Sequence, residues 1–168
     1  CIKNNLKNYK NVHISNFALD TDDGEKKLFI DKNNKGNLSF NYEMMSLHED
    51  KLNFLNDKND FIITTCKKTE NFFNEIRNDL KNIIKIDVQG YDEVVFQEIP
   101  IETLKKTHIL IIEITPLTTK KIDFEKFGRN LDYFKKFTDF EGKEYSKDDV
   151  INLVKRVKGK SFDLVFLN

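Results

Sequence analysis

Two segments in the second half of the chain are almost continuously hydrophobic. Ile83–Ile86 and His108–Ile114 are rich in Ile and Leu, and a helix-like segment, Tyr91–Ile99, lies between them. Strands that are buried on both faces of a parallel sheet show such uninterrupted apolar runs. The pattern therefore predicts a βαβ crossover, a connection that is right-handed in about 98% of cases.

Shorter patterns predict strands on the N-terminal side of this unit. The segment NVHISNFAL, residues 11–19, alternates with period two and is followed by a turn-rich stretch, Thr21–Gly24. The runs KLFID and NLSF are joined by a loop with Asn34 and Gly36, which favours a β-hairpin. Phe61–Thr65 is β-branched and aromatic and predicts a further strand.

Helices are predicted where apolar residues recur every three or four positions. Thr69 is placed to cap a helix that buries Phe72, Phe73, Ile76 and Leu80. A second set with helical spacing comprises Phe124, Phe127, Leu131 and Phe134. Ser146 and Asp149 have the spacing of a capping box, and Gly159 is placed to end the helix that they begin. With SFDLVFLN as a last strand, we expect an open α/β sheet with helices on both faces.

Composition and charge narrow the class of protein. The 168 residues suit one domain, 1–168, and 39% are hydrophobic. Lys and Arg number 28, as do Asp and Glu, so no overall positive charge favours nucleic acid as a partner. No run approaches the roughly 20 apolar residues of a membrane span, and no signal peptide is recognisable. The two cysteines form no CxxC pair, so we expect reduced thiols and a cytoplasmic location.

Two carboxylates stand at the ends of the apolar strands, where open α/β sheets bind their ligands. Asp87 follows Ile83–Ile86, and Glu113 lies near the end of His108–Ile114. Neighbouring strands are about 4.8 Å apart, so these side chains can face one cleft and serve as catalytic groups. In the alternative interpretation, Asp87 caps the turn into the next helix, and Glu113 pairs with a lysine such as Lys85.

Other catalytic systems find little support in the sequence. His13, His48 and His108 lack the HxH or HExxH spacing of metal ligands, so we expect no metal site. Asp87 and Glu113 without a third ligand make a weak case for a metal-assisted hydrolase. The chain contains no GxSxG turn, no GxGxxG and no P-loop among its six glycines.

Several of these motifs occur in an order that resembles a known family. NVHISNFALDTDDG, the hairpin ending in NLSF, IKIDVQGYDEVV, HILIIEI and FDLVFLN follow one another as in the FkbM-type S-adenosylmethionine-dependent methyltransferases. The resemblance runs from Asn11 to Asn168, and its most specific part is Ile84–Val95. Order and spacing together are specific, whereas either short motif alone is weak.

The resemblance implies a Rossmann-like class I methyltransferase sheet, mostly parallel, with an inserted β-hairpin. It also implies methyl transfer from S-adenosylmethionine to a hydroxyl of a sugar, glycan or secondary metabolite. Asp87 would lie beside the methyl donor and the acceptor hydroxyl, and Glu113 would lie on the substrate side. The cofactor-binding residues that the resemblance implies are Asn16, Phe17 and Ala18 beside the adenine, and Ser39 near the pocket.

The chain departs from the family pattern at its N-terminus. Family members carry a glycine-rich DxGxNxG-like turn and then an acidic residue for the ribose, and both would precede Cys1. We therefore expect an N-terminally truncated methyltransferase domain that binds S-adenosylmethionine weakly on its own. The alternative is a non-catalytic, degenerate Rossmann-like module that binds a partner through an exposed sheet edge.

Overall fold

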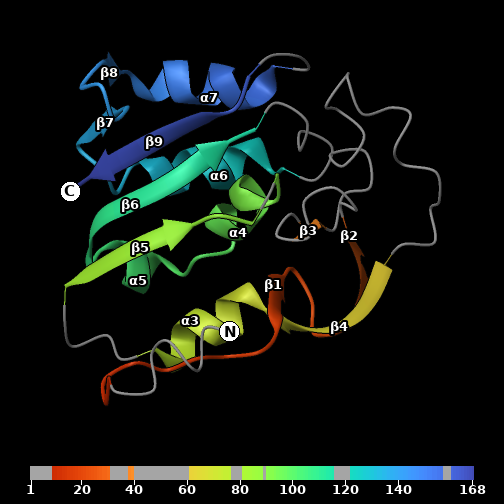
Figure 1. Cartoon of the computed structure of the whole chain (residues 1–168). Helices are drawn as coiled ribbons and strands as arrows, with labels where there is room; N and C mark the ends of the chain where they lie inside the picture. Colours follow the sequence, from red (N-terminus) through yellow and green to blue (C-terminus); the bar gives the residue numbers. More distant parts are fainter. Residues whose placement is uncertain are drawn as a thin grey trace.

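The computed structural model describes residues 9–30, 38–39, 61–76, 81–88, 90–115, 122–156 and 160–168, which form two β-sheets and the helices packed against them (Figure 1). The strands are β1 (Ala18–Asp20), β2 (Gly24–Ile30), β3 (Leu38–Ser39), β4 (Phe61–Lys68), β5 (Asn82–Ile86), β6 (Thr107–Ile114), β7 (Lys136–Thr138), β8 (Glu144–Tyr145) and β9 (Phe162–Leu167). The helices are α3 (Thr69–Glu75), α4 (Asp92–Gln97), α5 (Ile101–Leu104), α6 (Phe124–Leu131) and α7 (Lys147–Lys155).

The larger sheet has five strands in the order β5-β6-β9-β7-β8. β5 and β6 are parallel, with Ile83 opposite Ile109 and Ile86 opposite Ile112, and α4 and α5 connect them. This arrangement confirms the predicted βαβ unit. The remaining pairs of this sheet, β6 with β9, β9 with β7, and β7 with β8, are antiparallel.

The smaller sheet has four strands in the order β1-β4-β2-β3. β2 and β3 pair antiparallel, with Phe29 opposite Ser39, so the predicted β-hairpin is confirmed. β4 is antiparallel to β2 and parallel to β1, with Ala18 opposite Cys66. Only the last part of the strand predicted over residues 11–19 is a strand in the structure. β1 begins at Ala18, and the residues from Val12 to Asn16 are exposed.

The expected mostly parallel Rossmann-like sheet is wrong for the described residues. Two strand pairs, β1–β4 and β5–β6, are parallel, and the five other described pairs are antiparallel. The physical reason is that an apolar run such as Phe162–Leu167 reports burial and says nothing of strand direction. The described residues therefore form a mixed α/β fold with two mixed sheets.

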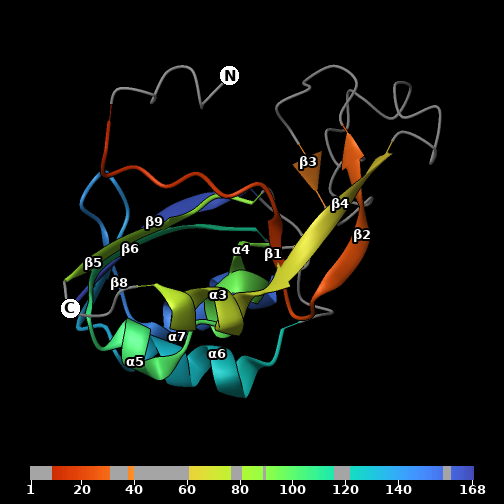
Figure 2. The same cartoon turned by 90° about the horizontal axis from the view of Figure 1, so that it is seen from below.

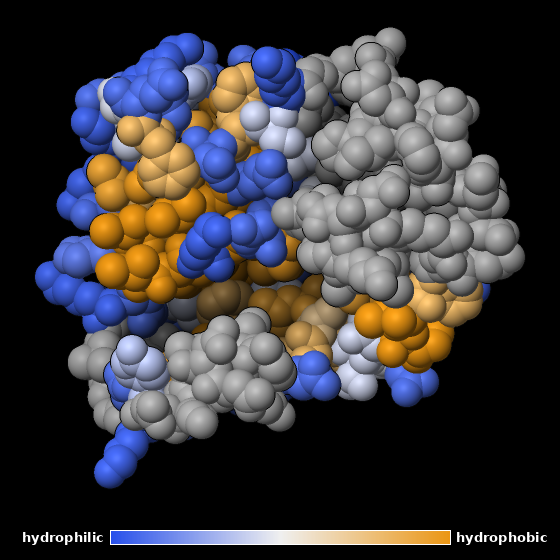
Figure 3. All heavy atoms as spheres, in the orientation of Figure 1, coloured by the Kyte–Doolittle hydropathy of each residue, from blue (hydrophilic) through white to orange (hydrophobic). Residues whose placement is uncertain are grey.

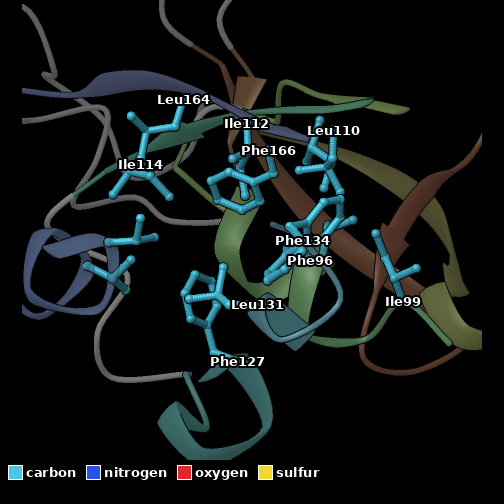
Figure 4. Packing of buried hydrophobic residues seen from close by; sticks show 14 of the residues in the cluster. Phe96, Ile99, Leu110, Ile112, Ile114, Phe127, Leu131, Phe134, Leu164 and Phe166 are labelled. Atoms are coloured by element: carbon cyan, nitrogen blue, oxygen red, sulfur yellow. The ribbon is translucent and has the colours of Figure 1, made fainter. Parts of the chain in front are cut away.

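The helices beside the larger sheet lie on one of its faces, so the expectation of helices on both faces is also wrong for the described residues. Figure 2 shows α4, α5, α6 and α7 on the same side of β5, β6 and β9. Leu110 and Ile112 of β6 and Phe166 of β9 are fully buried on that side. In Figure 4 these side chains point towards Phe96 and Phe127, and the rings of Phe96 and Phe166 meet edge to face at 5.6 Å.

Of the two predicted helix N-caps, the structure contains the one at Ser146 and lacks the one at Thr69. Ser146 and Asp149 form the predicted capping box of α7. α3, in contrast, begins after Lys68 without a side-chain cap, and the Thr69 hydroxyl donates to the Asp20 carbonyl instead. Ile76 is exposed and lies beyond α3, while the predicted positions Leu80 and Gly159 fall outside the described residues. Among the described helices, none combines the length and the apolar character that crossing a bilayer requires.

Candidate functional site

The face of the larger sheet opposite the helices carries the candidate catalytic carboxylates. Strand alternation places three facing pairs of β6 and β9 there, and we call this surface the outer face: Ile109 with Leu167, Ile111 with Val165, and Glu113 with Asp163. Hydrophobic atoms gather over β5, β6 and β9 in the view of Figure 3, and polar groups border them. The outer face thus joins an apolar surface to a carboxylate-bearing end.

Asp87 lies where β5 ends, close to an ion-pair partner on the same strand. Lys85 Nζ is 2.6 Å from Asp87 Oδ2, and the two side chains are 60% and 47% exposed. Lys85 is opposite Ile111 of β6, which places Asp87 towards Glu113 at the carboxyl ends of the two strands. The ion pair orients the carboxylate, and because both side chains are solvent-accessible it contributes little to stability.

Glu113 is half-buried on the outer face, and its environment favours the protonated form. Burial raises the pKa of its carboxyl, and the charges of Asp163 and Asp87 raise it further. The Ser161 hydroxyl, which donates a hydrogen bond to Glu113, and the Lys85 ammonium act in the opposite direction. The structure therefore brings Asp87 and Glu113 into one electrostatic cluster, as their strand-end positions predict.

Asp163 is a third member of this cluster that sequence reasoning missed. It lies directly opposite Glu113 in the β6–β9 register and is exposed. A signal was present, since Asp163 is the one charged residue within the apolar run SFDLVFLN. Its significance depends on the pairing of β9 with β6, which local patterns do not reveal.

The Asp92 carboxylate accepts hydrogen bonds across the turn between β5 and α4. It accepts from the Val88 N–H at 3.4 Å and from the Gly90 N–H at 3.2 Å. Gly90 has φ +83°, a left-handed conformation that glycine adopts without a Cβ clash. Burial raises the pKa of Asp92 to about 7, and the charge of Glu113 raises it as well. The hydrogen bonds from Val88 and Gly90 act in the opposite direction.

A second buried acid of α4 supports the end of β6. Glu93 is fully buried, and its carboxylate accepts a hydrogen bond of 2.6 Å from the Thr115 N–H, just beyond Glu113. This contact fixes the backbone where the strand leaves the sheet. It thereby contributes to the orientation of Glu113.

A buried network joins the smaller sheet to the turn that follows Asp87. Asp20, at the end of β1, is 2% exposed, accepts a hydrogen bond of 2.6 Å from the Tyr91 hydroxyl and pairs with Lys26 at 2.5 Å. Burial raises the pKa of Asp20, but hydrogen bonds from Lys26, Tyr91 and Thr21 outweigh it, so the net shift is downwards. An ionised Asp20 therefore holds β1 next to the start of α4.

The predicted cofactor residues lie in two places, one at the start of β1 and the other on β3. Asn16 is exposed, and Phe17 is half-buried against Phe72, with ring centroids 5.5 Å apart. Ala18 begins β1, so these three residues lead directly to Asp20 and its bond to Tyr91. Ser39 lies on β3 of the hairpin, in a different sheet from Asp87 and Glu113.

The described residues do not form a metal site. Across the described ranges, no group of three or more His, Cys, Asp or Glu residues is arranged to hold a metal ion. That includes the carboxylates of the outer face. Cys66, on β4, is a free and buried thiol.

Comparison with known proteins shows the family to which the chain belongs. Its residues 2–146 match the family described as "Methyltransferase FkbM domain". Neither the search of the curated proteins nor the search of the solved structures found a similar protein. Because the match covers most of the chain and includes Asp87, Glu113 and the β5–α4 turn, as the motifs of the sequence predict, the chain belongs to the FkbM methyltransferase family.

Proposed function

We propose that this methyltransferase moves a methyl group from S-adenosylmethionine to a hydroxyl oxygen of a sugar, glycan or other small molecule. Family membership supports methyl transfer. The observation that carries the rest is the pair Asp87 and Glu113, on adjacent parallel strands at one end of the outer face. Carboxylates in that position suit a hydroxyl, because they accept its hydrogen bond and can take its proton.

Asp87 is the residue to which we assign the acceptor hydroxyl. Its side chain is about half exposed and is held by Lys85, so one oxygen is oriented while the carboxylate stays accessible. S-adenosylmethionine supplies an electrophilic methyl group on a positively charged sulfur. Asp87 would accept the hydroxyl proton while the methyl group passes to the oxygen and its bond to sulfur breaks, which leaves a neutral thioether. Glu113 would hydrogen-bond a neighbouring hydroxyl on the substrate side.

The described residues fit a positively charged methyl donor at this end of the sheet. Asp87 and Asp163 place negative charge on either side of Glu113 there, which suits a sulfonium cation. We assign Asn16, Phe17 and Ala18 to the adenine end, since the half-buried Phe17 ring offers a flat apolar surface. Ser39 is assigned to the rim of the pocket on the basis of the family resemblance alone. A cytoplasmic location belongs to the same proposal.

A non-catalytic role as an interaction module is the second candidate. Within the described residues β5 pairs with β6 alone, and Ile83 on β5 is 71% exposed. Unpaired strand edges with exposed apolar side chains are common sites of association. This role predicts no methyl transfer under any condition.

The deciding experiment follows labelled methyl groups from S-adenosylmethionine into hydroxyl-bearing acceptors, using the protein that contains these residues. We expect a methyl ether product and, in Asp87→Asn, a loss of turnover of about 100-fold or more with cofactor affinity largely kept. The matched control is Asp132→Asn, an exposed ion-pair partner of Lys147, which should keep full activity. Transfer to nitrogen alone, or unchanged turnover in Asp87→Asn, would refute the proposal.

A further inference from the structure

A cavity lies away from the outer face, between β8 and α7. Its volume is about 360 Å³, which is within the range of small-molecule sites. Residues 143–145 form one wall. The other wall is one face of α7, with Asp149, Asn152 and Leu153, together with Arg156 at the C-terminal end of the helix. We call it the α7 groove.

Arg156 lines this groove and carries two buried hydrogen-bond donors that lack an acceptor among the described residues. Its Nε and Nη2 atoms are shielded from solvent, and neither has an acceptor within the part of the chain that the structure describes. The guanidinium carbon lies 4.9 Å from the centre of the Phe162 ring, so the group is held over an aromatic face. Buried donors without protein partners are rare in native proteins, and a bound ion is one kind of group that satisfies them.

The acidic residues of the groove are already engaged by other groups. Glu144 forms an ion pair with Lys136 across the β7–β8 hairpin. Asp149 accepts hydrogen bonds from the Ser146 backbone N–H at 2.9 Å and from its hydroxyl at 2.7 Å. These bonds lower the pKa of Asp149 and keep its charge at the helix cap. Neither acid neutralises the guanidinium of Arg156 through an ion pair among the described residues.

Lys143 adds a second positive charge on the opposite wall. Its Nζ lies 4.9 Å from the centre of the Tyr145 ring, and its charge acts on Asp149. The Tyr145 hydroxyl donates to Asp139 at 3.0 Å, which fixes the ring as one side of the groove. Two cations thus stand beside an aromatic ring and the apolar side chain of Leu153.

We propose that the α7 groove binds the oxyanion group, phosphate or carboxylate, of a small molecule. Arg156 donates to two oxygens of the anion through its planar fork, a geometry that guanidinium groups match well. Lys143 supplies the second charge, and Tyr145 and Leu153 contact the less polar part of the ligand. This site is separate from the proposed methyl-transfer site, so either can fail without the other.

The test is an NMR titration of the full 168-residue chain with inorganic phosphate and, separately, with malonate, to distinguish the two sources of oxyanion. We expect phosphate, malonate or both to shift the amide signals of Tyr145, Asn152 and Leu153. Affinity should fall roughly tenfold or more in Arg156→Gln and less in Arg156→Lys, which keeps the charge without the fork. The control Arg129→Gln, exposed and paired with Glu125 on α6, should bind as the wild type does.

Arg156→Gln also removes the contact with the Phe162 ring and can therefore unfold the chain. Lys143→Gln tests the site without removing that contact. Lys143 is exposed, so this variant should fold normally and bind the anion more weakly by a factor of about three. Two results overturn the proposal. One is the absence of any shift at these amides with either anion. The other is equal affinity in wild type, Arg156→Gln and Lys143→Gln, which would show that neither cation contacts the anion.

Discussion

The two faces of the larger sheet come from the same strands and have different tasks. On the helix side, Leu110, Ile112 and Ile114 of β6 are fully buried against the aromatic cluster of α4 and α6. On the outer face, Ile109, Ile111 and Glu113 of the same strand are only partly buried. One side of β6 therefore stabilises the fold, and the other side can place a carboxylate at its end without burying it in the core.

The largest effect should come from placing the same charge on each face of β6. Ile112→Asp buries an unpaired carboxylate and should destabilise the domain by several kcal/mol, against a total stability of about 5–15 kcal/mol. Ile111→Asp, one residue earlier on the outer face, should cost clearly less. Chemical denaturation compares the two variants, and equal losses would show that the faces do not differ.

A smaller, pH-dependent effect should separate the buried acid Asp92 from exposed acids. Its folded pKa, about 7, lies above its unfolded value, so its stabilising contribution is present at low pH and is lost as the pH rises through 7. Relative to Asp92→Asn, the wild type should lose on the order of 2 kcal/mol of stability between about pH 5 and pH 8. Urea unfolding across this range measures the difference.

Asp148→Asn is the control for that series, because Asp148 is exposed in the first turn of α7. It should change stability by less than about 0.5 kcal/mol. A stability difference between wild type and Asp92→Asn that stays constant with pH would contradict the raised pKa.

The link between the two sheets should have a measurable but moderate effect. Tyr91→Phe removes the hydroxyl that donates to Asp20 and leaves part of a buried carboxylate unsatisfied, which should cost about 1–3 kcal/mol. Tyr133→Phe, in a half-buried ring elsewhere, is the matched control with a smaller expected loss. If both variants unfold at the same denaturant concentration, the Asp20–Tyr91 bond does not join the sheets.

Local patterns were sufficient where the physics is local. The βαβ unit, the β2–β3 hairpin and the Ser146–Asp149 capping box depend on residues close in sequence, and all three were predicted. Strand direction was not, since the run Phe162–Leu167 would be apolar in either orientation. In the structure this run is β9, which pairs antiparallel with β6.

The candidate site was predicted in part for the same reason. Asp87 and Glu113 follow from strand ends, because the ends of parallel neighbours meet at one edge. Asp163 and the bond between Asp20 and Tyr91 join residues that are far apart in sequence, and the apolar pattern contains no information on them. Asp92 was missed because a carboxylate two residues after glycine reads as an ordinary exposed helix start.

The central claim is that Asp87, Glu113 and Asp163 form one electrostatic cluster on the outer face. NMR titration of the labelled Glu113 carboxyl tests it without any substrate. We predict a pKa above the ordinary value for glutamate, which falls in Asp87→Asn and in Asp163→Asn and is unchanged in Asp132→Asn. A Glu113 pKa at its ordinary value, or one that responds to neither neighbour, would contradict the account.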